Sequence, residues 1–164
     1  MLAEIFAYKQ WAGARTVEAL RRVDAQRFPA TLAFARQQLN HLRIVEELFR
    51  ARLLGEPDPH PATHAAEVPE LDALARMLAE SDRWYAGYIG ALPARRLDEP
   101  VRFRFADGQP GRMSRREMLF HVANHGTYHR GSIAHALDQA QVPHPADTYT
   151  VFIHATEPQR RLPG

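Results

Sequence analysis

The sequence predicts an all-α fold, a four-helix bundle with a short β-hairpin before the last helix. Four long stretches carry apolar residues at mixed three- and four-residue steps, which is the period of an amphipathic helix. A short stretch ahead of the fourth alternates apolar and basic residues instead, as a half-buried strand does. Four amphipathic helices with modest connections pack most simply as a bundle. The 164 residues are expected to form a single domain over 1–164.

Helix-breaking residues set the expected limits of the four helices. Pro29 separates the first two, Gly55 stands at the expected C-cap of the second, and Pro93 ends the third. The proline-dense stretch 55–69 cannot continue a helix. The two longer linkers, 55–69 and 93–114, allow a connectivity other than simple up-down-up-down. The helices are therefore predicted at residues 2–24, 31–54, 69–92 and 115–141.

The predicted hairpin lies immediately before the fourth helix. Its first strand is Val101–Phe105, the dipeptide Asp107-Gly108 is a strong turn signal, and a brief return strand follows. Ser114 and Glu117 have the three-residue spacing of a capping box and mark the start of the helix. After that helix, the apolar tail Val151-Phe152-Ile153 is expected to pack back on the bundle.

Composition and charge exclude several classes of protein. The chain has 21 Lys and Arg, 19 Asp and Glu and a formal net charge of +2, with no basic run long enough for a nucleic-acid arm. It has no cysteine, which excludes disulfides, thiolate metal sites and a cysteine nucleophile. It shows neither a secretory signal pattern nor the ~20 apolar residues of a membrane span. A cytoplasmic protein without nucleic-acid or membrane partners is therefore expected.

His121, His125 and His129 recur at four-residue steps within the predicted fourth helix. Successive members of such a series lie about 40° apart around a helix, so all three share one face. A polar surface stripe, or hydrogen-bonded core histidines, would account for one or two of them. A third favours a metal site, because imidazoles at i and i+4 can bind one ion. One helix face cannot surround an ion, so a further ligand must come from elsewhere.

His41 is the natural ligand from another helix, because it is the only other histidine predicted to be helical outside the fourth helix. Spacing alone does not decide which two of the three histidines join it. Three neutral imidazoles hold a divalent ion and leave a coordination position open, as in catalytic sites. Imidazoles suit Zn, Ni, Cu or Fe. The other histidines are expected outside the site, in the proline-rich loop, pointing away from the series, or in the tail: His60, His64, His135, His144 and His154.

Several segments together resemble one family of proteins. These are Asn40-His41-Leu42 through Leu54-Gly55, the run from His121 that ends in Tyr128-His129-Arg130-Gly131, and the tail from Asp147 to Ile153. Tyr8-Lys9-Gln10-Trp11-Ala12 on the first helix adds a weaker similarity. They resemble the DinB/YfiT-like family over nearly the whole chain, and the His-x3-His-Arg-Gly motif is the most specific part of the resemblance.

The resemblance implies a four-helix bundle, usually a homodimer, with a three-histidine site for a divalent metal, Zn or Ni above all. Carried over by position, the ligands are His41, His125 and His129. His121, Tyr128 and Arg130 would then lie near the site without binding the ion. The family commonly has glutamine where this chain has Ser132, a departure that leaves the ligands intact. Some relatives are transferases or isomerases that use a low-molecular-weight thiol such as bacillithiol or mycothiol.

Two classes of function remain open from the sequence. The leading hypothesis is a metal-dependent enzyme, a thiol-dependent transferase or isomerase or a hydrolase, in which the ion lowers the pKa of a bound thiol or water. The alternative is a non-enzymatic metal-binding stress-response protein. No general base is evident, since Glu46 and Glu47 lie more than 100° from His41 around an ideal helix and are expected on a solvated face. Arg130 has two interpretations of equal weight, a substrate carboxylate partner or a buried ion pair. The substrate is a small molecule that the sequence does not identify.

Overall fold

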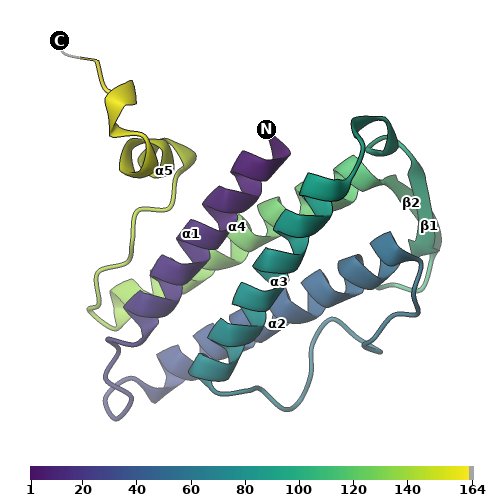
Figure 1. Ribbon diagram of the computed structural model, residues 1–164. Helices are drawn as coiled ribbons and strands as arrows, with labels where there is room; N and C mark the ends of the chain where they lie inside the picture. Colours follow the sequence, from purple (N-terminus) through teal and green to yellow (C-terminus); the bar gives the residue numbers. More distant parts are fainter. Residues whose placement is uncertain (163–164) are drawn as a thin grey trace.

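A computed structural model describes residues 1–162 and confirms the four-helix bundle (Figure 1). Its long helices are α1 (Leu2–Leu20), α2 (Pro29–Leu54), α3 (Leu71–Ala91) and α4 (Arg115–Gln139). The antiparallel hairpin of β1 (Pro100–Arg104) and β2 (Pro110–Ser114) immediately precedes α4, as predicted. Short 3-10 helices (Ala94–Arg96 and Pro158–Arg160) flank the regular elements.

The helices do not alternate in direction along the chain. In Figure 1, α1 and α4 run from the hairpin end of the bundle toward the far end, and α2 and α3 run the opposite way. Because α2 and α3 are parallel, the connection between them has to return along the length of the bundle, and Figure 1 shows it doing so. The proline-rich linker is thus a long crossover that passes over α2, and this brings it close to His41.

The helix ends follow local chemistry, with small departures from the expected limits. Gly55 adopts the left-handed conformation (φ 77°) and caps α2. Ser114 and Glu117 form both halves of a capping box at α4. The first helix ends at Leu20, earlier than predicted. Asp24 explains this difference. Its side chain accepts hydrogen bonds from the backbone N–H groups of Gln26 and Arg27, which stabilises a turn instead of a helix.

Buried apolar residues form separate clusters along the bundle, and one of these clusters extends under the hairpin. Leu74, Tyr85, Leu119, Ile133 and Leu137 are each 0% exposed, and burial of a side chain of this size contributes about 1.5–3 kcal/mol. At the hairpin end, the apolar side chains that face α2 and α4 come from alternate positions of the two strands: Val101, Phe103 and Met113. The apolar residues of the alternating pattern in Val101–Phe105 therefore lie on the inner face of the hairpin.

The tail forms a fifth helix, α5 (Tyr149–Thr156), that the sequence did not predict. It stands to one side of the bundle next to α1 (Figure 1). Phe152 packs its ring against Tyr8 and Trp11, with ring centroids 5.9 and 5.5 Å away. The expectation that this tail packs back on the bundle is therefore met.

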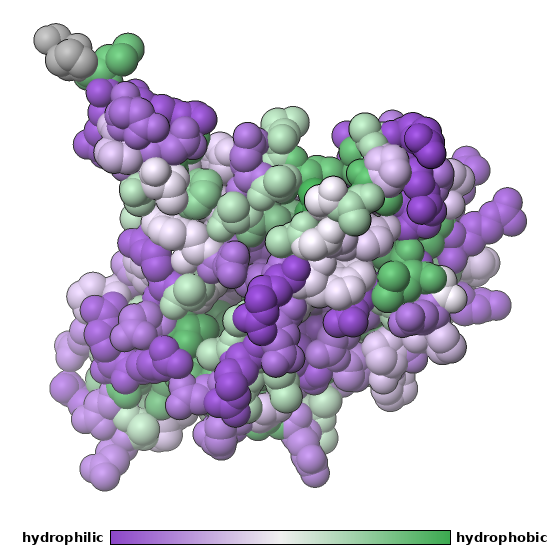
Figure 2. Space-filling view, in the orientation of Figure 1, coloured by the Kyte–Doolittle hydropathy of each residue, from purple (hydrophilic) through white to green (hydrophobic). Residues whose placement is uncertain are grey.

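On the face drawn in Figure 2, hydrophilic residues predominate and apolar residues lie between them. Within residues 1–162, no helix has both the length and the hydropathy that crossing a bilayer requires. Large exposed apolar side chains include Phe105 in the hairpin turn and Phe120 and Tyr128 on α4.

Candidate metal centre

Three histidines from α2 and α4 meet between the two helices. The Nε2 atom of His125 lies 3.1 Å from Nε2 of His41 and 3.0 Å from Nε2 of His129. A ligand atom from each of the three lies within 4.8 Å of those of the other two. The antiparallel packing of α2 and α4 therefore places His41 opposite two successive turns of α4, and the cluster is compatible with metal binding.

The outer nitrogens of two of these rings determine how the inner ones are protonated. Nδ1 of His41 lies 2.6 Å from the backbone oxygen of Thr63, and Nδ1 of His129 lies 2.5 Å from Oε1 of Gln38. Both oxygens can only accept, so each Nδ1 carries the proton, and each neutral ring turns an unprotonated Nε2 inward. This is the arrangement in which an outer hydrogen bond orients a metal-binding histidine.

A count of protons shows why a cation fits among the three rings. His41 and His129 both direct a lone pair at Nε2 of His125, which can donate a single proton to only one of them at a time. At least one inward lone pair then has no donor. A divalent ion at the centre would accept a lone pair from each of the three rings. In a tetrahedral site, Zn–N bonds of about 2.0–2.1 Å place the ligand nitrogens about 3.3 Å apart. The two spacings from His125, 3.1 and 3.0 Å, are within a few tenths of an ångström of that value.

Burial favours the uncharged form of the three histidines on α4. It lowers the pKa of His125 to about 3, and the neighbouring His129, His41 and His121 add to the effect. Burial likewise lowers the pKa of His129, with a further contribution from His41, and that of His121. A neutral imidazole is the form that binds metal, so no proton needs to be displaced at neutral pH.

His121 lies one turn before His125 and lines the approach to the cluster. Its ring stacks between that of Phe49 (centroids 4.7 Å apart) and that of His125 (5.2 Å). Tyr128 meets the ring of His129 edge-on at 5.1 Å, but its side chain is 71% exposed. Both residues are therefore in contact with the cluster, His121 from inside the fold and Tyr128 from the outer surface.

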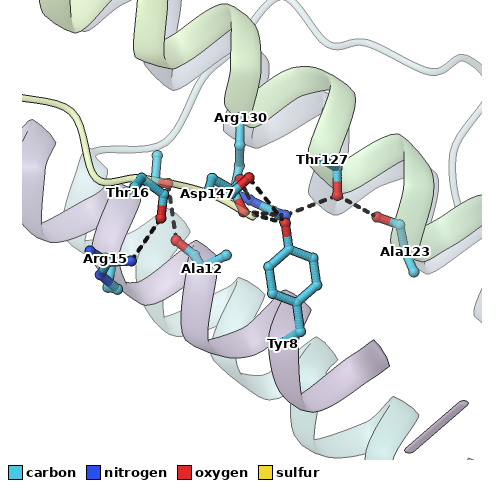
Figure 3. Close-up of polar contacts among 9 residues, drawn as sticks. Tyr8, Ala12, Arg15, Thr16, Ala123, Thr127, Arg130 and Asp147 are labelled. Atoms are coloured by element: carbon cyan, nitrogen blue, oxygen red, sulfur yellow. Dashed lines mark hydrogen bonds and ion pairs between the residues drawn. The ribbon is translucent and has the colours of Figure 1, made fainter. Parts of the chain in front are cut away.

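Arg130 extends from α4 toward Asp147 and Tyr8 of α1 (Figure 3). Its guanidinium pairs with Asp147 at 2.7 Å and donates to the hydroxyl of Thr127 at 3.1 Å. The hydroxyl of Tyr8 donates a hydrogen bond to the same carboxylate of Asp147, a residue in the segment before α5. Of the two interpretations of Arg130, the buried ion pair is the one that the structure contains.

The expectation of a solvated Glu46 is wrong. Its side chain is 2% exposed and accepts a hydrogen bond from Lys9 at 2.7 Å, and Lys9 also reaches Asp82 at 2.6 Å. The error arose because only position relative to His41 was considered, whereas Glu46 faces α1 and α3. Lys9 could have indicated a buried acidic partner, because the only lysine of the chain lies among the apolar residues of the first helix.

The loop histidines lie outside the three-histidine cluster. His60, expected to be solvated, instead bonds to Glu47, whose carboxylate also takes a bidentate contact of 2.8 Å from Arg43. The histidines after the cluster make only peripheral contacts, to Gln139, Asp138 and Arg161 respectively: His135, His144 and His154. Gln38 was missed by the sequence analysis, although it precedes His41 by three residues and so shares its helix face.

A cavity of about 650 Å³ opens beside the cluster and reaches His41, His121 and His125. Its walls come from four elements, α2, the crossover, the hairpin and the first half of α4. Most of the lining is apolar, including Val45, Leu48, Phe49, Phe105 and Met113. Its size falls within the range of small-molecule sites, about 300–1,000 Å³.

Comparison with known proteins identifies relatives over the whole described fold. The family model of the DinB family matches residues 1–161. Protein DinB of Bacillus subtilis (strain 168) is 23% identical over 171 aligned residues, and the alignment covers 96% of this chain and 96% of that protein.

Proposed function

This chain belongs to the DinB family, and from that premise we propose that it is a divalent-metal-binding protein whose ligands are His41, His125 and His129. One observation carries the proposal. Nε2 of His125 lies at hydrogen-bond distance from Nε2 of both His41 and His129, and ligand atoms of all three lie within 4.8 Å of one another, while the outer nitrogens of His41 and His129 bond to acceptors. Zn or Ni suits such an all-imidazole set.

We further propose that the protein is an enzyme, a thiol-dependent transferase or isomerase or else a hydrolase. When bound, the ion would supply Lewis acidity, which lowers the pKa of a thiol or water beside it. Gln38 and Thr63 would hold His129 and His41 in the orientation that the ion requires. His121 and Phe49 would form a wall of the cavity through which a small molecule approaches. The apolar lining would exclude water from that approach.

One observation favours the alternative, a non-enzymatic metal-binding protein of the stress response. Among residues 1–162, the only carboxylate that lines the cavity is Asp58, and both of its oxygens accept from Arg52, at 3.0 and 2.8 Å. A free carboxylate for general-base work is therefore lacking in the described lining. Turnover of a thiol together with an electrophile by the metal-loaded protein would reject this alternative.

The proposal includes a homodimer in the cytoplasm. Phe120 and Tyr128 are 60% and 71% exposed on the outward face of α4, and apolar surface of this kind is typical of an interface. Sedimentation equilibrium would decide the matter, and a mass of 18.7 kDa at micromolar concentration would contradict the dimer.

The metal proposal is tested by elemental analysis of untagged protein and three variants. We expect about one transition-metal ion per chain in the unmodified protein and in His135→Ala, whose histidine is exposed and bonds only to Gln139. His41→Ala, His125→Ala and His129→Ala should each lose tight binding, because two imidazoles from the cluster hold an ion far less strongly than three. Stoichiometric metal in the His41 variant would overturn the assignment.

A further inference from the structure

The hairpin forms the outer wall of the cavity beside the histidines. Arg104 at the end of β1, Phe105 and Gly108 in the turn, and Met113 of β2 all line it, opposite Phe49 of α2. A bundle alone would leave the cluster on an open groove between α2 and α4. The hairpin therefore defines which molecules can approach the cluster.

The position of Phe105 depends on a glycine across the hairpin. A Cβ atom on Gly111 would lie 2.1 Å from the Phe105 ring, so the ring keeps this position only opposite a glycine. The Phe105 side chain remains 41% exposed at the cavity mouth. Phe49 is 7% exposed and its ring stacks on that of His121, so the exposed aromatic surface at the mouth comes from Phe105. Such surface is stabilised when a ligand covers it.

The charged side chains that line the cavity carry a net positive charge. The charged residues that line it are Arg52, Asp58 and Arg104. Arg52 and Asp58 neutralise each other through a bidentate contact. Arg104 donates to the carbonyl oxygen of Gly108 at 3.0 Å, and no carboxylate within residues 1–162 forms an ion pair with it. One positive charge at the mouth is therefore uncompensated, and a divalent ion at the cluster would add to it.

We propose that the cavity binds an amphiphilic organic carboxylate, with its apolar body against Phe105 and Met113 and its carboxylate on Arg104. This inference rests on the proposed function, because it names the class of small molecule that approaches the metal centre. A guanidinium matches a carboxylate in charge and in its forked geometry. A neutral molecule of the same shape would leave Arg104 without an anion, and an amine would be repelled by it.

The test compares 4-phenylbutanoate with 4-phenylbutan-1-ol, which differ in the charged group and share the apolar body. Both are titrated calorimetrically into the zinc-loaded protein and two variants, Arg104→Gln and Arg102→Gln. Arg102 is a matched control, since it is exposed on the same strand but does not line the cavity. We expect the carboxylate to bind about tenfold more tightly than the alcohol, the value of one charge-assisted hydrogen bond. Arg104→Gln should remove that preference and Arg102→Gln should keep it.

A second titration on chelator-treated protein separates Arg104 from the ion, because a carboxylate can also bind a metal directly. We expect the preference for the carboxylate to persist without metal and to remain sensitive to Arg104→Gln. Equal affinities for the two probes in the unmodified protein would overturn the inference. So would a preference that disappears on chelation and survives Arg104→Gln. If the protein takes up no metal, the proposed function fails, and the metal-free titration still decides on the carboxylate site.

Discussion

Gln38 illustrates how a neutral side chain on α2 can control a cluster that α4 largely supplies. Its Oε1 accepts the Nδ1 proton of His129, so it selects the tautomer that turns Nε2 toward the other rings. We expect Gln38→Leu to weaken metal affinity 10–100-fold, the usual cost of removing such an outer partner. Competition with a chromophoric chelator measures this. Gln37→Leu is the control, because Gln37 is exposed and makes no bond to a histidine in residues 1–162. Equal affinities in the two variants would mean that Gln38 does not orient His129.

At the scale of elements, one carboxylate holds the segment before α5 to the bundle. Asp147 accepts from Arg130, whose side chain is 3% exposed, and from Tyr8 of α1. Burial, together with the hydrogen bond to Asp147, raises the pKa of Tyr8, which therefore stays protonated and remains the donor. Arg15 adds a bond of 3.0 Å to the backbone of Ala146. The segment before α5 thus follows the bundle through polar contacts, and α5 itself through aromatic ones.

We expect Asp147→Asn to destabilise the protein by about 1–3 kcal/mol, because it leaves the buried guanidinium of Arg130 without its counter-charge. Urea denaturation measures the loss. Glu157→Gln is the control, since it removes an exposed pair with Arg160 that is worth roughly 0–1 kcal/mol. If both variants lost the same small amount, the Asp147 pair would have no special role in holding the segment before α5.

At the scale of the whole molecule, Lys9, Glu46 and Asp82 join three of the four helices inside the bundle. Burial would lower the pKa of Lys9, but the two carboxylates outweigh it and raise that pKa, so the ammonium stays charged. Burial raises the pKa of Glu46, although Lys9 opposes this. A buried ion pair is weak evidence for stability. The contacts of Lys9 with Glu46 and Asp82 link α1 to both α2 and α3 inside the bundle.

We expect Lys9→Met to cost about 3–5 kcal/mol, since it leaves two buried carboxylates facing each other. The triple variant Lys9→Met, Glu46→Gln, Asp82→Asn should recover most of that loss, because it removes the charges together. Urea denaturation of both variants gives the comparison. If the triple variant were no more stable than the single one, the loss would reflect packing around Lys9 rather than unpaired charge.

The sequence by itself determined the four long helices, the hairpin and the capping box, since these depend on periodicity and on side chains within a few residues of one another. It also predicted that the histidines of the last helix share a face, and it indicated His41 as the ligand from another helix. The resemblance narrowed the set to His41, His125 and His129, the three that the fold brings together. The ends of the helices and the fifth helix were less predictable, because turn chemistry at Asp24 and packing against Tyr8 and Trp11 decide them.

Only the tertiary structure decided what each polar side chain meets across the bundle. Glu46 was expected in solvent because its position was measured against His41 alone, whereas its partners Lys9 and Asp82 lie on other helices. Thr63 and Gln38 orient the histidines through contacts between segments far apart in the chain, and Arg104 reaches the cavity because the hairpin folds over α2. Helical periodicity specifies which face of one helix a residue occupies. The identity of its partner depends on the direction and register of the neighbouring helix, which no local pattern encodes.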